Sequence, residues 1–161
     1  GQWKNIAKCP VNISKYILVY MMQKDNEVYE HVLWMKRKWK LPVVDISRYG
    51  YKPDFVDQSL VDIGPDEFIG LFQNAQYVCT NSYHGLVFSI IFRKKICLIP
   101  SKRFGDRISN LLQVLELEHK EKQNDMESYM LEYNTEHIQK VIDREKEKAL
   151  KYLCKCLKET K

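Results

Sequence analysis

The residues best suited to chemistry lie in the segment 77–85, which contains Ser82 and His84. Its apolar beginning predicts a short buried strand, and Asn81 and Ser82 are residue types that commonly cap a helix start. The first backbone N–H groups of such a helix are unpaired, and their partial positive charge favours an anion. An imidazole in that first turn can transfer protons near neutral pH. Gly85 allows a ligand or another backbone segment to come close.

The apolar residues 86–92 follow this segment, and their period alone does not separate helix from strand. A helix is favoured because capping residues precede the run and the cations 93–95 follow it. The alternative interpretation is purely structural: Ser82 is an ordinary cap and His84 an ordinary surface histidine.

A second junction of the same kind follows further along the chain. A strand-like run precedes Lys102, Arg103 and Arg107, and a helical pattern comes next. In a parallel sheet with right-handed crossovers, both junctions lie at the same edge. Arginine suits bidentate binding of phosphate or carboxylate. We therefore predict that these cations share a site with Ser82 and His84, and the alternative is that they are solvated surface charges.

Strand-like and helical segments alternate through most of the chain, which predicts an α/β fold with a Rossmann-like parallel sheet flanked by helices. The expected organisation is a lead-in segment at 1–14, a Rossmann-like core at 15–117, and a charged linker with a long C-terminal helix at 118–161. One short strand of the core is expected at 61–63. Helical spacing from 138 to 156 predicts the apolar stripe of the final helix.

Two further polar side chains lie on predicted helices. Glu67 falls in a first turn after Gly64 and Pro65, where it could contact a sugar or nucleotide hydroxyl. An acidic residue at this position more commonly complements the helix dipole. His31 lies off the apolar stripe of the helix 27–39 and is expected to face solvent.

Composition narrows the function classes. The net charge of +5 suits a phosphorylated or carboxylated ligand, but it is too small and too dispersed to indicate nucleic acid binding. Five cysteines at irregular spacing do not form a disulfide framework, and the C-x-C at Cys154 and Cys156 lacks the other ligands of a zinc site. We expect no metal, no cofactor and a reducing compartment. No secretory signal and no apolar run of about 20 residues is present.

The run 75–92, together with Arg103, Arg107 and the helix at Leu111 and Leu112, resembles the polysaccharide pyruvyl transferase family. The family pattern places an aromatic residue inside S-x-H-G after a strand. An apolar helix and another strand follow, and then an arginine ahead of an R-I/L-x-x-L-L-like helix. The resemblance covers roughly residues 15–117 and involves several elements in the same order and spacing.

The resemblance implies a larger architecture. The family is similar to two-domain transferases of the GT-B type, in which two Rossmann-like halves face a cleft. This chain is then expected to be the C-terminal half, and the missing N-terminal half of the same protein becomes a partner. The final helix would pack back toward that half. Whether the fragment alone is active is left open.

The resemblance also implies an activity, which is transfer of pyruvate from phosphoenolpyruvate onto sugar hydroxyls as a ketal during exopolysaccharide synthesis. His84 would be the catalytic acid or base. The acceptor would be a sugar or a lipid-linked oligosaccharide. The location would be cytoplasmic, with a peripheral position at the inner face of the membrane left open. The substrate-binding candidates are Ser82, Gly85, Arg103, Lys102, Arg107 and Glu67.

Two other functions fit the same pattern. The first is a GT-B-like glycosyltransferase that uses a nucleotide sugar, in which Glu67 and the first helical turns would bind ribose and pyrophosphate. The second is a non-catalytic binding module that keeps the fold. In that module His84 and Arg103 would not share a pocket.

Overall fold

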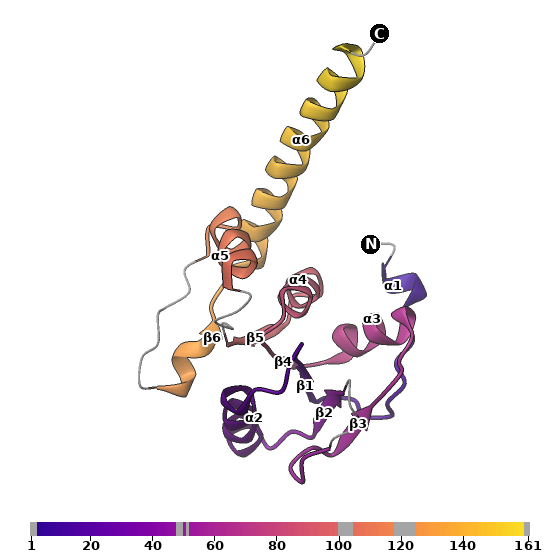
Figure 1. Cartoon of the computed structure of the whole chain (residues 1–161), viewed down its shortest axis with the longest axis vertical. Helices are drawn as coiled ribbons and strands as arrows, with labels where there is room; N and C mark the ends of the chain where they lie inside the picture. Colours follow the sequence, from indigo (N-terminus) through magenta and orange to yellow (C-terminus); the bar gives the residue numbers. More distant parts are fainter. Residues whose placement is uncertain (1–2, 48–49, 51, 100–104, 118–124, 160–161) are drawn as a thin grey trace.

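A six-stranded sheet forms the centre of the protein (Figure 1). The computed structural model describes residues 3–47, 50, 52–99, 105–117 and 125–159. The strand order is β3-β2-β1-β4-β5-β6, with the first five strands parallel and β6 antiparallel to β5. This is the doubly wound order of a Rossmann-like sheet, so the predicted fold class is confirmed. The strands are β1 Ile17–Tyr20, β2 Val43–Ile46, β3 Gln58–Leu60, β4 Tyr77–Thr80, β5 Lys95–Leu98 and β6 Met130–Leu131.

Helices cover both faces of this sheet. Side chains alternate along each strand, so Ile17 and Val19 of β1 pack toward α2, whereas Leu18 packs toward α3. A third apolar cluster joins α4, α5 and the start of α6 to β5. The described helices are α1 Trp3–Ile6, α2 Asn26–Trp39, α3 Pro65–Asn74, α4 Tyr83–Ile91, α5 Gly105–Val114, the 3-10 helix η1 Met126–Tyr129 and α6 Thr135–Glu159.

The central strands are buried on both faces because helices cover both sides. This burial explains their nearly continuous apolar sequence. Leu18, Val44 and Val78 have no exposed surface, and burying one such side chain contributes about 1.5–3 kcal/mol. The sheet is thus a rigid base from which the strand-to-helix turns project.

The short strand at the sheet edge lies slightly earlier than expected. The predicted strand at 61–63 is wrong in position, because β3 is Gln58–Leu60. The carbonyl of Leu60 accepts a hydrogen bond from the Ser47 N–H, and Asp62 then takes a left-handed conformation with φ of 54°. That backbone conformation ends the extended segment before Ile63.

His31 is buried in α2, so the prediction that it faces solvent is wrong. It is only 3% exposed, and its Nδ1 lies 2.7 Å from the carbonyl oxygen of Glu27. Its ring packs 4.3 Å from the Tyr129 ring, measured between centroids. Tyr129 also donates a hydrogen bond to the Glu27 carboxylate at 2.9 Å. The cover therefore comes from η1, in a segment that the sequence pattern predicts to be a linker.

The C-terminal helix α6 extends well beyond the rest of the molecule (Figure 1). Asn134 caps it, because its Oδ1 accepts hydrogen bonds from the N–H groups of Glu136 and His137 at 2.8 and 3.1 Å. Its first turns pack on α5 through Ile138 and Val141. Among the described helices, α6 included, none is both long and apolar enough to cross a membrane.

Candidate functional site

The strand order changes direction between β1 and β4, which is where open α/β sheets bind ligands. Asn81 joins the two turns that leave these strands. It is 5% exposed, its Nδ2 donates to Asp25 Oδ2 at 3.3 Å, and its Oδ1 accepts from the Met22 N–H at 3.4 Å. Asp25 is the N-cap of α2. The carboxamide therefore fixes the starts of α2 and α4 next to one another.

The turn from β4 to α4 is held tightly by Thr80. Its hydroxyl donates to the Tyr20 carbonyl at 2.6 Å and accepts from the Ser82 N–H at 3.0 Å. A Cβ added to Gly85 would lie 2.2 Å from Thr80 Oγ1. The absence of a side chain at Gly85 is thus required by the close approach of Thr80. A direct role of Gly85 in ligand binding stays a prediction.

The N-terminus of α4 is left open. Ser82 is the N-cap residue, but its side chain makes no capping hydrogen bond, and α4 has no acidic residue in its first turn. Ser82 is 1% exposed, and its buried Oγ has no hydrogen-bond partner among the described residues. The N–H groups of Tyr83, His84 and Gly85 precede the first intrahelical bond, from Leu86 to the Ser82 carbonyl.

An imidazole and a guanidinium share one aromatic neighbour at this turn. His84 is exposed, and its ring centroid lies 5.7 Å from that of Tyr83. The Cζ of Arg107, in the first turns of α5, lies 5.7 Å from the same Tyr83 centroid. Arg107 of α5 and His84 of α4 therefore both lie near the Tyr83 ring. Lys102 and Arg103 lie outside the described residues.

Glu67 has a local partner. Its Oε2 accepts a hydrogen bond from the Gly64 N–H at 2.8 Å, and together with Asp66 it gives the first turn of α3 two carboxylates. Asp66 also pairs with Lys8 at 2.9 Å. The geometry thus supports the structural interpretation of Glu67 as a helix-start residue, and contact with a ligand hydroxyl stays a prediction.

One polar group at this edge of the sheet was missed by the sequence analysis. Asp45 lies in β2 next to Ser59 of β3 and is 3% exposed. Burial raises the pKa of its carboxyl to about 6. Neither Asp45 Oδ1 nor Ser59 Oγ has a hydrogen-bond partner among the described residues. An aspartate inside the apolar run 43–46 was the available signal.

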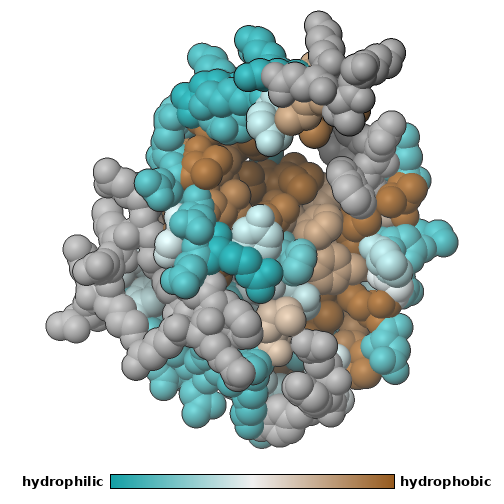
Figure 2. All heavy atoms as spheres, turned by 45° about the horizontal axis from the view of Figure 1, so that its top comes forward, coloured by the Kyte–Doolittle hydropathy of each residue, from teal (hydrophilic) through white to brown (hydrophobic). Residues whose placement is uncertain are grey.

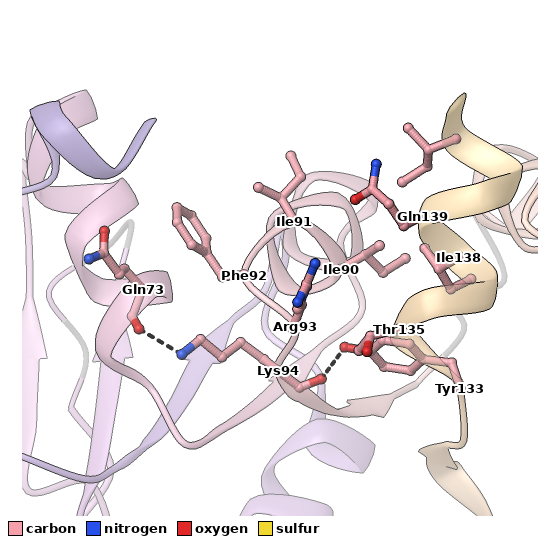
Figure 3. Close-up of a pocket in the computed structure, with 11 residues that line it drawn as sticks. Gln73, Ile90, Ile91, Phe92, Arg93, Lys94, Tyr133, Thr135, Ile138 and Gln139 are labelled. Carbon is pink, nitrogen blue, oxygen red and sulfur yellow. Dashed lines mark hydrogen bonds between the residues drawn. The ribbon is translucent and has the colours of Figure 1, made fainter. Parts of the chain in front are cut away.

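A hollow of about 700 Å³ lies at the opposite end of α4. Hydrophobic residues gather in the hollowed centre of the face drawn in Figure 2. Figure 3 shows α4 ending between α3, which carries Gln73, and α6, which carries Ile138. Lys94 links these parts, because its Nζ donates to the Gln73 carbonyl and its carbonyl accepts from the Tyr133 hydroxyl, both at 2.6 Å. This hollow is therefore separate from the turn that carries His84.

No metal centre is indicated within the part of the chain that the structure describes, because no group of three His, Cys, Asp or Glu side chains is suitably clustered there. The chemistry available at the turn is instead that of an imidazole, a guanidinium, a phenol and free amides. Such a set can bind a small anion and move a proton.

Comparison with known proteins identifies a family. The family model described as polysaccharide pyruvyl transferase matches residues 2–103. Among curated proteins, no match to the chain was found. A solved structure, the UDP-GlcNAc 2-epimerase of Methanocaldococcus jannaschii in complex with UDP-GlcNAc and UDP, is similar with 9% sequence identity and a TM-score of 0.45. The alignment covers 94% of this chain and 47% of the epimerase, so the chain spans about half the length of that structure.

Proposed function

Because the chain belongs to the polysaccharide pyruvyl transferase family, a family of transferases, we propose that its β4–α4 turn binds phosphoenolpyruvate. The protein would use this donor to place pyruvate on a sugar as a ketal. One observation carries the proposal: α4 starts without an acidic residue or a side-chain cap, above a buried Ser82 hydroxyl that has no partner among the described residues.

The donor chemistry matches these groups. Phosphoenolpyruvate carries a phosphate and a carboxylate, and both need positive partners. Its methylene carbon takes up a proton, which leaves C2 cationic. One sugar hydroxyl then bonds to C2, and a second hydroxyl replaces the phosphate as the C–O bond to phosphate breaks. Of the two hydroxyl protons, one balances the proton gained by the methyl group and the other leaves with the phosphate.

Each residue of the turn has a role in this scheme. The free N–H groups at the start of α4 and the Ser82 hydroxyl would bind phosphate oxygens. His84, exposed at the same turn, would exchange the proton with the methylene carbon or with a sugar hydroxyl. Arg107 would neutralise a donor anion from its place beside Tyr83. Lys102 and Arg103 follow β5 in sequence, and we propose the same role for them.

The neighbouring helices make α4 the preferred anion site. The N-terminus of α2 is capped by Asp25, whose carboxylate accepts from the Glu27 N–H at 3.0 Å. The N-terminus of α3 carries Asp66 and Glu67. A bound anion would meet a carboxylate of the helix start itself at both, whereas α4 has no acidic residue in its own first turn. The acceptor would be a sugar or a lipid-linked oligosaccharide, and the reaction would take place in the cytoplasm.

The proposal is tested by NMR titration of the 161-residue chain with phosphoenolpyruvate. We expect the backbone amide signals of residues 82–86 to shift, because those amides would hold the phosphate. A nucleotide diphosphate sugar should leave the same signals in place. Shifts caused by the nucleotide sugar at this turn, or none caused by phosphoenolpyruvate, would refute the proposal. Transfer is then followed by mass spectrometry of sugar acceptors for the pyruvate ketal.

A further inference from the structure

The C-terminal end of α2 carries a dense group of cations beside a second hollow. Four of the five residues from 36 to 40 are lysine or arginine. The hollow measures about 540 Å³ and is lined by three of these cations, by the apolar residues Leu33, Leu41 and Pro42, and by one carboxylate, Asp57. The last acidic residue of α2 is Glu30, about 10 Å before Arg37 along the helix axis. This end of the helix is therefore basic.

Two of the four cations have a carboxylate partner, and two do not. Lys36 pairs with the carboxylate of the hollow at 2.8 Å, and Lys38 pairs with Glu127 at 2.6 Å. Arg37 and Lys40 are exposed and form no ion pair with any of the described residues. The lining of the hollow thus has three cations against one carboxylate, and this excess of positive charge attracts an anion.

Lys40 takes an unfavourable backbone conformation at the rim of this hollow. It follows α2 with φ of 53°, and its N–H donates to the Lys36 carbonyl at 3.0 Å. Glycine is the usual residue at such a helix end, because a side chain disfavours the left-handed conformation. Lysine is thus less favourable here for the backbone, but it adds a positive charge beside the hollow.

Two tryptophans share this end of the helix. The half-buried rings of Trp34 and Trp39 lie 5.3 Å apart between centroids, and Lys38 Nζ lies 5.0 and 5.6 Å from them. Trp39 also stacks on Tyr77, with the centroids 4.0 Å apart. Tryptophan and lysine together are typical of surfaces at the head-group layer of a membrane, where the ring is partly in apolar surroundings and the amine reaches phosphate.

The apolar lining favours a phospholipid over other anions. Inorganic phosphate and the nucleic acid backbone have no apolar part that would cover the half-buried Leu33, Leu41 and Pro42. A phospholipid joins a phosphate to acyl chains, so it can contact the cations and the apolar residues together. Four or more cations clustered on an amphipathic helix are typical of binding to anionic lipid.

This end of α2 lies apart from the candidate site. The helix runs from the carboxyl end of β1 to the amino end of β2, so residues 36–40 lie at the opposite edge of the sheet from the turn that carries His84. Figure 1 shows α2 on the opposite face of the sheet from α3, and far from α6. A surface bound here would leave the turn open.

We propose that the end of α2 and its connection to β2, residues 33–42, bind the head group of an anionic phospholipid at a bilayer surface. Arg37 and Lys40 contact the phosphate, Leu33 and Leu41 contact the first acyl carbons, and the two tryptophan rings lie at the same depth. The proposal does not depend on the proposed activity, because none of these residues belongs to the turn after β4.

Sedimentation of the 161-residue chain with vesicles tests this. We expect binding to phosphatidylcholine vesicles that contain phosphatidylglycerol, and none to phosphatidylcholine alone. Binding should weaken between 0.1 M and 1 M salt, because the Debye length falls from about 10 Å to about 3 Å. Arg37→Gln combined with Lys40→Gly should lower the partition coefficient at least ~10-fold, since each cation near an anionic bilayer contributes roughly a factor of five. This variant should fold, because glycine suits the conformation of residue 40.

The matched control is Lys146→Gln combined with Arg93→Gly. It removes the same charge from exposed positions outside α2, and Arg93, with φ of 55°, is also a left-handed residue just after a helix. Its partition coefficient should change less than ~3-fold, because these cations do not line the second hollow. An equal loss in both variants would indicate a general attraction of the net charge and would overturn the proposal.

Tryptophan emission locates the contact. In a Trp3→Phe background the remaining tryptophans are Trp34 and Trp39. Their emission should shift to shorter wavelength on anionic vesicles and be quenched by brominated lipid. Unchanged emission of the bound chain overturns the proposal, as does failure to bind anionic vesicles. NMR shifts at residues 36–41 caused by glycerol phosphate, without vesicle binding, would indicate a soluble ligand instead.

Discussion

The helices α3 and α4 both begin at the carboxyl edge of the sheet, yet their N-termini are completed differently. In α3, Pro65 starts the helix, Glu67 accepts from the Gly64 N–H, and Asp66 adds a second carboxylate. In α4, the Ser82 side chain makes no capping hydrogen bond, and the first turn contains no acidic residue. A capping side chain is worth about 1 kcal/mol of stability. The comparison teaches that α4 lacks a stabilising feature at the place where an anion could supply it.

The largest expected effect concerns the imidazole that stands at the open helix start. His84→Ala, in the enzyme that carries out the transfer, should lower kcat at least ~10²-fold, which is the low end for a general acid or base. Steady-state ketal formation measures this. His137→Ala is the matched control, because His137 is exposed on α6 and pairs with Glu116 away from the turn. Unchanged turnover in His84→Ala would remove this residue from the mechanism.

The second test compares glycines at the two helix starts. Gly85→Ala should destabilise the protein by about 1–3 kcal/mol, as overpacking does, because the new Cβ would lie 2.2 Å from Thr80 Oγ1. Gly64→Ala should cost less, since its nearest neighbour at 2.8 Å is the flexible Asp66 side chain. Urea unfolding of both variants measures the difference. Equal losses would show that the α4 turn is no more tightly packed than the α3 cap.

The third test compares two aspartates, Asp66 at the start of α3 and the buried Asp45 of β2. The pKa of Asp66 is lowered by its hydrogen bond to Lys8, whereas burial raises that of Asp45 to about 6. A folded-state pKa above the unfolded value means that Asp45 contributes stability below pH ~4, which is lost as pH rises through about 6. Asp45→Asn should therefore gain about 1–3 kcal/mol over the native protein between pH 4 and pH 8.

Unfolding free energies at both pH values measure this gain, and Asp66→Asn is the control. It should show no comparable gain between pH 4 and pH 8, because its pKa is lowered and the stability it contributes is lost only as the pH falls below about 4. A pH profile of Asp45→Asn parallel to that of the native protein would mean that the buried carboxyl does not titrate in this range.

Local sequence patterns predicted most of the fold, because the burial of a strand or helix determines which side chains it carries. Continuous apolar runs gave β1, β2, β4 and β5, since strands covered on both faces need no polar side chains. The strand β6 has only two residues, Met130–Leu131, and exists because it pairs with β5. This pairing joins segments far apart in the sequence, so no local pattern predicts it. The burial of His31 under Tyr129 was missed for the same reason.

Some features of the candidate site could likewise be predicted from the sequence, and others could not. Chain topology alone predicts that the turns after β4 and β5 meet, and this stays a prediction for Lys102 and Arg103. Among the described residues, Arg107 of α5 and His84 both lie near the Tyr83 ring. The bond between Asn81 and Asp25 joins residues that are 56 positions apart, so no spacing rule could find it. The unpartnered Ser82 hydroxyl also depends on tertiary burial.

The smallest expected effect gives the most direct test of the comparison, because it makes α4 resemble α3. His84→Gln and His84→Glu both remove the imidazole, but only the second adds a carboxylate to the first turn. Glutamate should stabilise the helix by about 0.3–1 kcal/mol relative to glutamine. It should also weaken phosphoenolpyruvate binding at least ~10-fold at low salt, because a carboxylate at position 84 would lie close to the like charges of the bound donor.

Calorimetric titration and urea unfolding of the two variants measure both quantities, which should move in opposite directions. Glu67→Gln provides the converse control at α3, where loss of the bond to the Gly64 N–H should reduce stability and leave donor affinity unchanged. Equal donor affinities for His84→Gln and His84→Glu would place the anion elsewhere. The start of α4 would then be an uncapped helix N-terminus and not an anion site. The affinity of a ligand that binds away from these amides would not depend on a charge placed near them.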